Sequence, residues 1–222
     1  MKNIVIFIKE IWRGKDLYRI LMNAECANHE LWGTVLDVGS GVGFASYHRF
    51  FKKAADVKIV SLDIADASGK AEHAQIDLER DCLPYANDSI DIAIAFNVLE
   101  HIYNYSFLIS EIRRVLKPGG QVIGAAPFLI GYHPDPKDYW RYTKEALFKI
   151  FEGQNFKNTV IKPIGRGPFA VAYSQVEFML PRILKMIKLP VVLFLDWLIF
   201  KIKPNFHREK FALGLFFVLT KR

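Results

Sequence analysis

The sequence predicts one α/β domain whose core is a mostly parallel β-sheet covered by helices. Through roughly the first 150 residues, short apolar segments alternate with segments of helical periodicity. This alternation favours a parallel sheet, because parallel neighbours need a crossover connection. The first apolar segment, Thr34–Val38, runs directly into a glycine cluster, as a buried parallel strand does when it enters a tight turn. With 222 residues, 51% of them hydrophobic, the chain can bury a core of this size.

The elements follow one another in a regular order. Residues 1–30 are assigned to N-terminal helices, because Ile4, Ile8, Ile11 and Trp12 recur at helical spacing. Strands are predicted over residues 34–38, 57–62, 73–76, 91–96 and 121–126. Helices are predicted over residues 44–53 and 107–116, and Pro118-Gly119-Gly120 marks the end of the second.

The pattern changes in the last third of the chain. Thr143 is the predicted N-cap of a helix over residues 144–151, which Gly153 ends. Residues 158–164 and 211–219 have the composition of two further strands. Between them lies a basic, apolar helical insertion, residues 166–205, in which Pro181 and Pro190 are each placed to begin a helix. We expect a single domain, 1–222, with its core at 31–165 and its last strand within 206–222.

The charge of the chain is concentrated in this last third. Residues 153–222 carry 12 Lys and Arg against 3 acidic residues, whereas residues 1–152 carry 18 against 20. A basic and apolar segment favours an anionic membrane surface or an amphiphilic acceptor over nucleic acid. Segment 178–203 is therefore expected either to contact such a membrane or to cover the core. No signal peptide is predicted, because Lys9, Glu10 and Arg13 interrupt the first apolar stretch, so we expect a cytoplasmic or membrane-peripheral protein.

The strongest local motif is the glycine loop of residues 35–43, Val-Leu-Asp-Val-Gly-Ser-Gly-Val-Gly. Glycines after a buried strand let the backbone approach a ligand and present N–H groups to it. Asp63 stands at the end of the next strand, where a carboxylate can accept hydrogen bonds from ribose hydroxyls. These residues alone are also compatible with dinucleotide binding, or with a glycine loop that only forms a tight turn and an acid that is solvated at a strand end.

Further motifs follow in order: Asp77-Leu78, the segment Leu-Pro-Tyr-Ala-Asn-Asp-Ser-Ile-Asp at residues 83–91, and Leu-Lys-Pro-Gly-Gly at 116–120. With the glycine loop, they make the sequence resemble the class I S-adenosylmethionine-dependent methyltransferases, in the small-molecule, type 11-like branch, over about residues 30–155. The resemblance implies a Rossmann-like sheet with a late antiparallel strand and a helical insertion before the last strand. It also implies S-adenosyl-L-methionine as the cofactor.

The resemblance assigns cofactor contacts residue by residue. The amino-acid end of the cofactor would be surrounded by Gly39, Ser40, Gly41 and Gly43. The ribose would bind to Asp63, and the adenine would bind to Asp77 and Leu78. Asn97 would lie beside the methionine portion. Asp37 and Ile64 complete the set of predicted cofactor-binding residues. Only 14 positions separate Asp63 from Asp77, so the segment between them must be very short for this family.

Two histidines are candidate catalytic bases if the acceptor is a hydroxyl. His101 follows the fourth strand, at the edge where open α/β sheets place their sites, and its alternative is a structural role. His133 belongs to an aromatic, proline-containing loop, residues 132–143, that resembles a segment of methyltransferases from bacterial surface-glycan pathways. There Asp138, Tyr139 and Arg141 are predicted to bind substrate, unless the aromatics cap the core and Arg141 pairs with Asp138. No metal site is predicted, because Glu100-His101 is too small a ligand set and the chain has only two cysteines.

The leading functional hypothesis is O-methylation of a small or lipid-linked acceptor, such as a saccharide. A quinone or lipid methyltransferase and a noncatalytic cofactor-binding subunit stay open. A nicotinamide-dependent oxidoreductase is disfavoured by the segment 116–120. Methylation of nucleic acid is disfavoured because the fourth strand ends in Phe96-Asn97-Val98-Leu99, without an Asn/Asp-Pro-Pro-aromatic motif. The sequence leaves the acceptor and the oligomeric state open.

Overall fold

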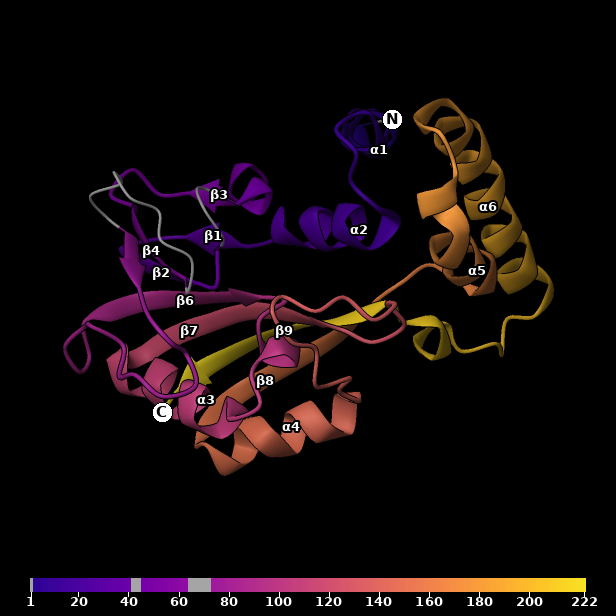
Figure 1. The fold of residues 1–222 in the computed structure, drawn as a ribbon. Coiled ribbons are helices and arrows are strands. Elements are labelled where there is room, and N and C mark those ends of the chain that lie inside the picture. Colours follow the sequence, from indigo (N-terminus) through magenta and orange to yellow (C-terminus); the bar gives the residue numbers. More distant parts are fainter. Residues whose placement is uncertain (1, 41–44, 64–72) are drawn as a thin grey trace.

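The computed structural model describes residues 2–40, 45–63 and 73–222 (Figure 1), with the backbone alone for residues 2–6, 63 and 73–75. Its centre is a seven-stranded sheet in the order β5-β4-β2-β6-β7-β9-β8. The strands are β2 (Thr34–Val38), β4 (Lys58–Asp63), β5 (His73–Gln75), β6 (Ile90–Phe96), β7 (Leu116–Pro127), β8 (Phe156–Ile164) and β9 (Gly214–Lys221). A separate short parallel pair joins β1 (Glu30–Leu31) to β3 (Lys52–Lys53).

Strand direction confirms the predicted sheet. The pairs β2–β4, β2–β6, β4–β5 and β6–β7 are parallel, whereas β9 runs antiparallel to both β7 and β8. The chain leaves β2 toward β4 and β5 on one side and returns to β6 on the other side. In open sheets of this kind, ligands bind where the strand order reverses, beyond the carboxyl ends of the strands. The topology therefore places the site beyond β2 and β6.

Helices cover both faces of the sheet (Figure 1). On one face lie α3 (Tyr105–Val115) and α4 (Lys144–Gly153), and on the other lie α1 (Lys2–Trp12) and α2 (Leu17–Cys26). Adjacent strand residues point to opposite faces, so Val35 joins the core beneath α2 whereas Leu36 joins the core beneath α3 and α4. Thr143 accepts a hydrogen bond from the Ala146 N–H, which confirms it as the N-cap of α4.

The predicted helix over residues 44–53 is wrong for the described part of that range. Residues 45–53 form a 3₁₀ turn, η1 (Ser46–Arg49), followed by β3. The buried Asp37 carboxylate accepts a hydrogen bond from the Tyr47 hydroxyl at 2.6 Å and lies 2.6 Å from His48 Nε2. This carboxylate holds the turn against β2, and the pairing of β3 with β1 extends the chain directly after it.

The segment between β8 and β9 is helical. It contains α5 (Pro168–Val176), the 3₁₀ turn η3 (Glu177–Met179), α6 (Arg182–Ile202) and the 3₁₀ turn η4 (Arg208–Phe211). In Figure 1, α6 stands at the edge of the molecule beside α1 and α5. The prediction that Pro190 begins a second helix is wrong, because α6 continues through it. Leu189 and Asp196 are both buried, so packing on the two sides of the proline keeps the halves in one helix.

Two buried acids attach this helical segment to the domain. Glu177 accepts a hydrogen bond at 2.8 Å from the N–H of Leu17, the first residue of α2. Asp196 of α6 accepts hydrogen bonds from the N–H groups of Phe169 and Ala170 in the first turn of α5. Burial raises the pKa of Glu177 from 4.5 to about 7. No helix within residues 2–40, 45–63 and 73–222 is both long and apolar enough to cross a membrane.

We expect Glu177 to make the stability of the protein decline as the pH rises. Between its ordinary pKa of 4.5 and about 7, the unfolded chain loses this proton while the folded protein keeps it. The free energy of unfolding therefore falls across this range, by at most about 3 kcal/mol, and the contribution is constant above it. Glu177→Gln keeps an acceptor for Leu17 and should remove this part of the pH dependence, measured by urea denaturation at pH 5 and pH 7.5.

The matched control is Glu152→Gln, which replaces an exposed acid of α4. Its unfolding free energy should keep the wild-type pH dependence. Parallel pH profiles for the wild type and Glu177→Gln would contradict the assignment.

Candidate active site

The chain has an unusual backbone where β2 and β6 end side by side. Gly39 and Asn97 follow these two strands, and both have positive φ, 66° and 55°. Glycine adopts this conformation without strain, and asparagine tolerates it better than most residues. A Cβ on Gly39 would lie 2.6 Å from Val98 Cγ2, so no larger residue fits there without a shift. The backbone therefore turns sharply at both strand ends, at the point where the strand order reverses.

A cavity of about 250 Å³ opens at this point. Its described lining comes from the ends of β2 and β6, the loop after β5 and the loop before α4. The predicted site residues in this lining are Gly39, Asp77, Leu78, Asn97 and His101. Five residues assigned from separate sequence motifs thus surround one cavity.

The loop after β5 carries two of these residues. Asp77 Oδ1 accepts a hydrogen bond at 2.9 Å from the Glu79 N–H, and the Asp77 N–H donates to Asp81 Oδ2 at 3.0 Å. These bonds curl the loop so that the Asp77 side chain, 40% exposed, lies at the rim of the cavity. Leu78 is buried beside it. The short connection from Asp63 therefore still delivers Asp77 to the predicted edge of the sheet.

Other predicted cofactor contacts are not tested by this geometry. Asp37 is fully buried, and its carboxylate contacts Tyr47 and His48 outside the described cavity lining. Ser40 is half-buried and also absent from that lining. Gly41, Gly43 and Ile64 lie outside the described residues, as does the side chain of Asp63, whose backbone ends β4. All of these contacts stay predictions.

A tyrosine that the sequence analysis missed reaches the site from α2. The Tyr18 hydroxyl donates a hydrogen bond to Asn97 Oδ1 at 2.6 Å. Burial raises the pKa of Tyr18 well above its ordinary value, so the hydroxyl stays a donor at neutral pH. The bond fixes the orientation of the Asn97 amide at the end of β6. No local motif marks Tyr18, because its role depends on how α2 packs across the sheet.

The loop of residues 131–142 is held by an internal ion pair. The two terminal nitrogens of Arg141 bind Asp138 at 2.5 and 2.7 Å, and Arg141 also donates to the carbonyls of Ile130 and Gly131. This guanidinium lowers the pKa of Asp138 to about 2. Asp138 in turn accepts a hydrogen bond from the His133 N–H at 2.9 Å. The pairing of Arg141 with Asp138, the alternative to substrate binding, is the arrangement found.

The aromatics of this loop pack against the domain. The Trp140 indole donates to the Ile102 carbonyl at 3.0 Å, and the Tyr142 hydroxyl donates to the Leu99 carbonyl at 3.0 Å. Tyr139 stays 38% exposed, with its ring edge-on to Tyr103. Among the three residues predicted to bind substrate, Tyr139 therefore offers an exposed surface, whereas Asp138 and Arg141 shape the loop.

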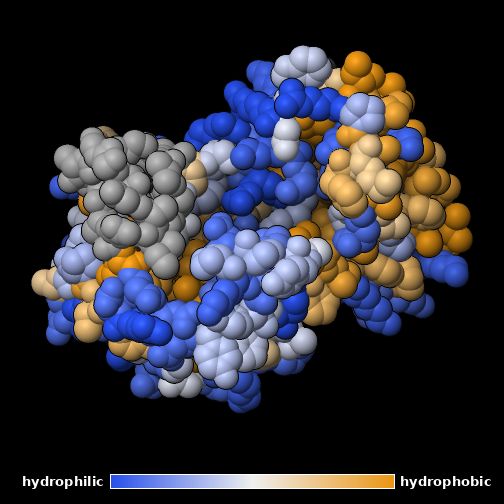
Figure 2. Space-filling view, viewed as in Figure 1, coloured by the Kyte–Doolittle hydropathy of each residue, from blue (hydrophilic) through white to orange (hydrophobic). Residues whose placement is uncertain are grey.

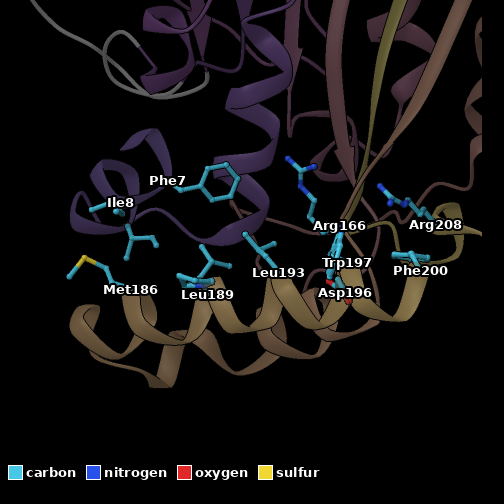
Figure 3. Close-up of a pocket in the computed structure, with 12 residues that line it drawn as sticks. Phe7, Ile8, Arg166, Met186, Leu189, Leu193, Asp196, Trp197, Phe200 and Arg208 are labelled. Atoms are coloured by element: carbon cyan, nitrogen blue, oxygen red, sulfur yellow. The ribbon is translucent and has the colours of Figure 1, made fainter. Parts of the chain in front are cut away.

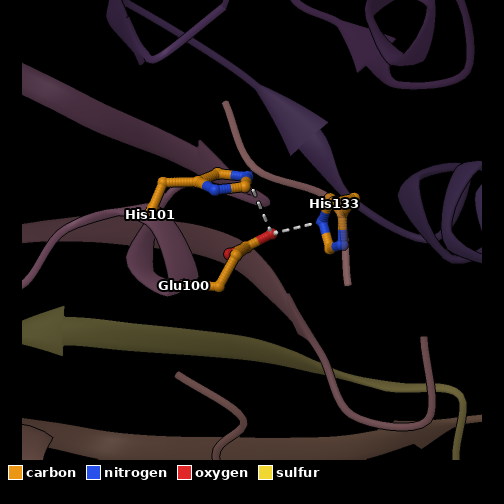
Figure 4. Close-up of side chains that lie close together, drawn as sticks. All are labelled: Glu100, His101 and His133. Atoms are coloured by element: carbon orange, nitrogen blue, oxygen red, sulfur yellow. Dashed lines mark ion pairs between the residues drawn. The ribbon is translucent and has the colours of Figure 1, made fainter. Parts of the chain in front are cut away.

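The two candidate bases meet at a buried carboxylate (Figure 4). Glu100 is 0% exposed, and its Oε1 lies 3.7 Å from the Nε2 atoms of both His101 and His133. The other ring nitrogen of each histidine contacts a backbone carbonyl, at Lys137 for His101 and at Gly131 for His133. Interaction with Glu100 is the main cause that raises the pKa of His133, against partial burial, which lowers it. The sequence placed Glu100 beside His101 but gave no sign that His133 joins them.

Comparisons with known proteins agree with this geometry. Residues 36–124 match the family described as "Methyltransferase domain". A probable S-adenosylmethionine-dependent methyltransferase of Mycolicibacterium smegmatis is 30% identical over 130 residues, 55% of this chain and 47% of the relative. A demethylmenaquinone methyltransferase of Oceanobacillus iheyensis is 28% identical over 166 residues, 68% of this chain and 66% of the relative. The chain thus spans about half to two thirds of the length of these relatives.

A solved structure shows the same fold. The crystal structure of a SAM-dependent methyltransferase from Archaeoglobus fulgidus superposes with a TM-score of 0.54 and 15% identity, covering 85% of this chain and 86% of that one. At this identity the likeness concerns the fold alone. Residues 36–124 thus match a methyltransferase domain, and the strand order and the superposition show the Rossmann-like fold of the class I S-adenosylmethionine-dependent methyltransferases.

Proposed function

We propose that this protein transfers the methyl group of S-adenosylmethionine to a hydroxyl of a small or lipid-linked acceptor, such as a saccharide. The observation that carries the proposal is the single cavity beyond β2 and β6, where Gly39 and Asn97 face the same space as His101. When bound, S-adenosylmethionine supplies a methyl carbon made electrophilic by its sulfonium.

The residues of the cavity suit this cofactor. Gly39 lines the cavity, so a ligand there can lie close to a backbone that carries no side chain. Gly39 to Gly43 would hold the amino-acid end, Asp63 the ribose, and Asp77 with Leu78 the adenine. Asn97, oriented by Tyr18, would contact the methionine portion. The domain then positions the donor while the loop before α4 covers the acceptor side, which favours an in-line displacement.

In this proposal His101 takes the acceptor's proton. A backbone carbonyl can only accept a hydrogen bond, so the 2.6 Å contact of Nδ1 with the Lys137 carbonyl assigns the ring proton to Nδ1. In the neutral ring, Nε2 then carries the lone pair that a general base needs. His133 has the same arrangement through Gly131. Either histidine could remove the proton of a hydroxyl as the methyl group is transferred.

A second cavity supports an acceptor with a hydrocarbon chain. It measures about 490 Å³, lies between α1 and α6, and shares no lining residue with the first cavity. Phe7, Leu189 and Leu193 line it, and Arg166 and Arg208 lie at the end opposite Met186 (Figure 3). An apolar channel with two guanidinium groups at one end suits an amphiphile that has an anionic group, such as a lipid phosphate.

The exposed side of α6 supports contact with a membrane. Ile183, Ile187, Val191 and Phe194 are between 55% and 63% exposed and follow one face of the helix. Apolar residues gather over this part of the surface (Figure 2). Two of the three acids in residues 153–222, Glu177 and Asp196, are buried, so the surface of this third is strongly cationic. We infer that segment 178–203 rests on an anionic bilayer, with the methyl acceptor drawn from it.

A quinone or other lipid acceptor is the second candidate. The relative from Oceanobacillus iheyensis is named for demethylmenaquinone, which is a hydrophobic acceptor. The apolar cavity between α1 and α6 suits such a molecule as well as it suits a lipid-linked saccharide. Labelled methyl transfer to a demethylated quinone, tested beside sugar acceptors, separates the two candidates.

Asp63→Ala tests the cofactor assignment. Hydrogen bonds from one carboxylate to two ribose hydroxyls contribute about 2–3 kcal/mol, so this change should weaken binding of S-adenosylhomocysteine roughly 30–200-fold by calorimetry. Asp56→Ala, which removes an exposed acid before β4, is the control and should bind as the wild type does. NAD should bind to none of these proteins. Unchanged affinity in a folded Asp63→Ala protein would rule out the assignment.

His101→Ala and His133→Ala test the base. Loss of a general base costs ~10²–10⁴ in rate, whereas affinity for S-adenosylhomocysteine should stay unchanged in both variants. The readout is labelled methyl incorporated into free sugars, polyprenyl-phosphate sugars and demethylated quinones. One variant should lose more activity than the other. If both variants keep near-wild-type rates on the best acceptor, proximity alone accounts for catalysis.

Vesicle co-sedimentation tests the membrane proposal. The wild type should bind vesicles with anionic phosphatidylglycerol but not pure phosphatidylcholine, and high salt should release it. Replacing Arg182, Lys185 and Lys188 with Gln should weaken binding by up to about 1 kcal/mol per residue. Ile187→Ser with Phe194→Ser should weaken it independently of salt.

The control for the vesicle assay removes the same charge elsewhere. Lys52, Lys53 and Lys58 are exposed near β3 and β4, far along the chain from α6. Their joint replacement with Gln should leave most of the binding intact. Wild-type protein that stays in the supernatant at low salt would exclude the membrane contact.

A further inference from the structure

We propose that Glu100, His101 and His133 bind a divalent transition-metal ion, with Zn²⁺ as the best-suited occupant. The sequence predicted no metal site, but the structure brings these three residues together at the edge of the methyl-transfer cavity, which His101 also lines. Binding of the ion follows from these three side chains alone. Its catalytic role rests on the proposed methyl transfer.

The distances are those of a metal site before closure around its ion. One ligand atom from each residue lies within 4.8 Å of the other two, and Glu100 Oε1 is 3.7 Å from each Nε2. Zinc lies about 2.0–2.2 Å from nitrogen and oxygen ligands, so tetrahedral ligand atoms are roughly 3.3–3.6 Å apart. Small side-chain rotations close the difference, and His133, whose side chain is 39% exposed, has room to make them.

Both imidazoles are held in the tautomer that metal ligands use. The Nδ1 atom of His101 lies 2.6 Å from the Lys137 carbonyl, and that of His133 lies 2.8 Å from the Gly131 carbonyl. Metal-binding histidines commonly donate their second ring N–H to a backbone carbonyl in this way. In the neutral form of each ring, Nε2 carries a lone pair, and the Nε2 atoms of both rings face the same carboxylate (Figure 4).

The buried carboxylate calls for a cation at this place. Glu100 is 0% exposed, and neither of its side-chain oxygens has a hydrogen-bond donor in the described part of the chain. A buried carboxylate without a hydrogen bond is costly, and the two Nε2 atoms at 3.7 Å are donors to it only when they carry protons. A divalent ion satisfies all three groups at once. Two protons, one on each imidazole, are the competing solution, and the experiment below separates the two.

The surrounding loop makes the arrangement rigid. The Glu100 carbonyl accepts hydrogen bonds from the N–H groups of Tyr139 and Trp140, at 2.7 and 3.2 Å. The ion pair of Asp138 with Arg141 holds the backbone of His133 on the other side. The backbones of Glu100 and His133 are thus held in place before any ion binds, as a preorganised site requires.

Three protein ligands leave one tetrahedral position open, which is the pattern of catalytic zinc sites. An acceptor hydroxyl in this position would have a lowered pKa and would release its proton to solvent. The hydroxyl oxygen then forms the new C–O bond while the C–S bond of the donor breaks and its electron pair goes to sulfur. In this arrangement the histidines would hold the ion, and the lowered pKa of the hydroxyl would replace the need for a histidine base.

Metal binding is measured on the full-length protein without any acceptor. After dialysis against a chelator, calorimetric titration with ZnCl₂ should show one site per chain, and CoCl₂ should give the visible absorption of a tetrahedral Co²⁺ complex. Glu100→Gln, His101→Ala and His133→Ala should each weaken Zn²⁺ binding at least 10–100-fold. His207→Ala, which removes an exposed histidine, should bind as the wild type does.

His133→Gln guards against misfolding, because His133 lies in a partly exposed loop. It should keep the wild-type circular dichroism spectrum and still lose Zn²⁺ binding. No Zn²⁺ binding by the wild type, or binding that persists in all three ligand variants, would overturn the metal site.

Titration of the same proteins with S-adenosylhomocysteine separates this inference from the proposed function. If the wild type binds S-adenosylhomocysteine but does not bind Zn²⁺, the metal site is overturned and the proposed methyl transfer stands. If the wild type binds Zn²⁺ but does not bind S-adenosylhomocysteine, the metal site stands and the proposed methyl transfer is overturned. Inhibition of methyl transfer by the chelator, reversed by Zn²⁺, is the result expected if the ion has the catalytic role.

Discussion

The close approach of Gly39 to Val98 is the constraint on which the site depends. It occurs where two parallel neighbours, β2 and β6, end at the same level, since Val38 pairs with Ala95. Gly39 after β2 and Asn97 after β6 both have positive φ, which lets the backbone turn out of the sheet directly after each strand. The space that they leave is the cavity, and every other group in the site is positioned relative to these two turns.

Several polar side chains around that cavity form hydrogen bonds with one another and thereby hold other residues of the site in place. Tyr18 orients Asn97, and Arg141 shapes the loop that carries His133. Asp138 binds both Arg141 and the His133 backbone. Such support is what a transfer reaction needs when the protein contributes chiefly by positioning. Asp138 and Arg141, which the sequence suggests as substrate-binding residues, instead form an ion pair and hydrogen bonds within their own loop.

The sequence predicted what short segments encode. Gly39, Asp77 and Asn97 each follow a predicted strand, so the topology alone brings them to one edge of the sheet. It failed where distant packing decides: α6 passes through Pro190 because both of its halves are packed, and Asp37 holds a turn where a helix was predicted. The contact of Glu100 with His133 could not be predicted either, because 33 positions, a helix and a strand separate them in the chain. Tyr18 lacked any local signal at all.

The capping of α5 by Asp196 bears on how this part of the chain folds. The first-turn amides of Phe169 and Ala170 obtain their acceptor from a residue 26 or 27 positions later, since no side chain at Gly167 caps the helix. A helix of 9 residues is too short to be stable by itself in water. Because α5 obtains these acceptors from α6, we expect the two helices to form and unfold as one cooperative unit.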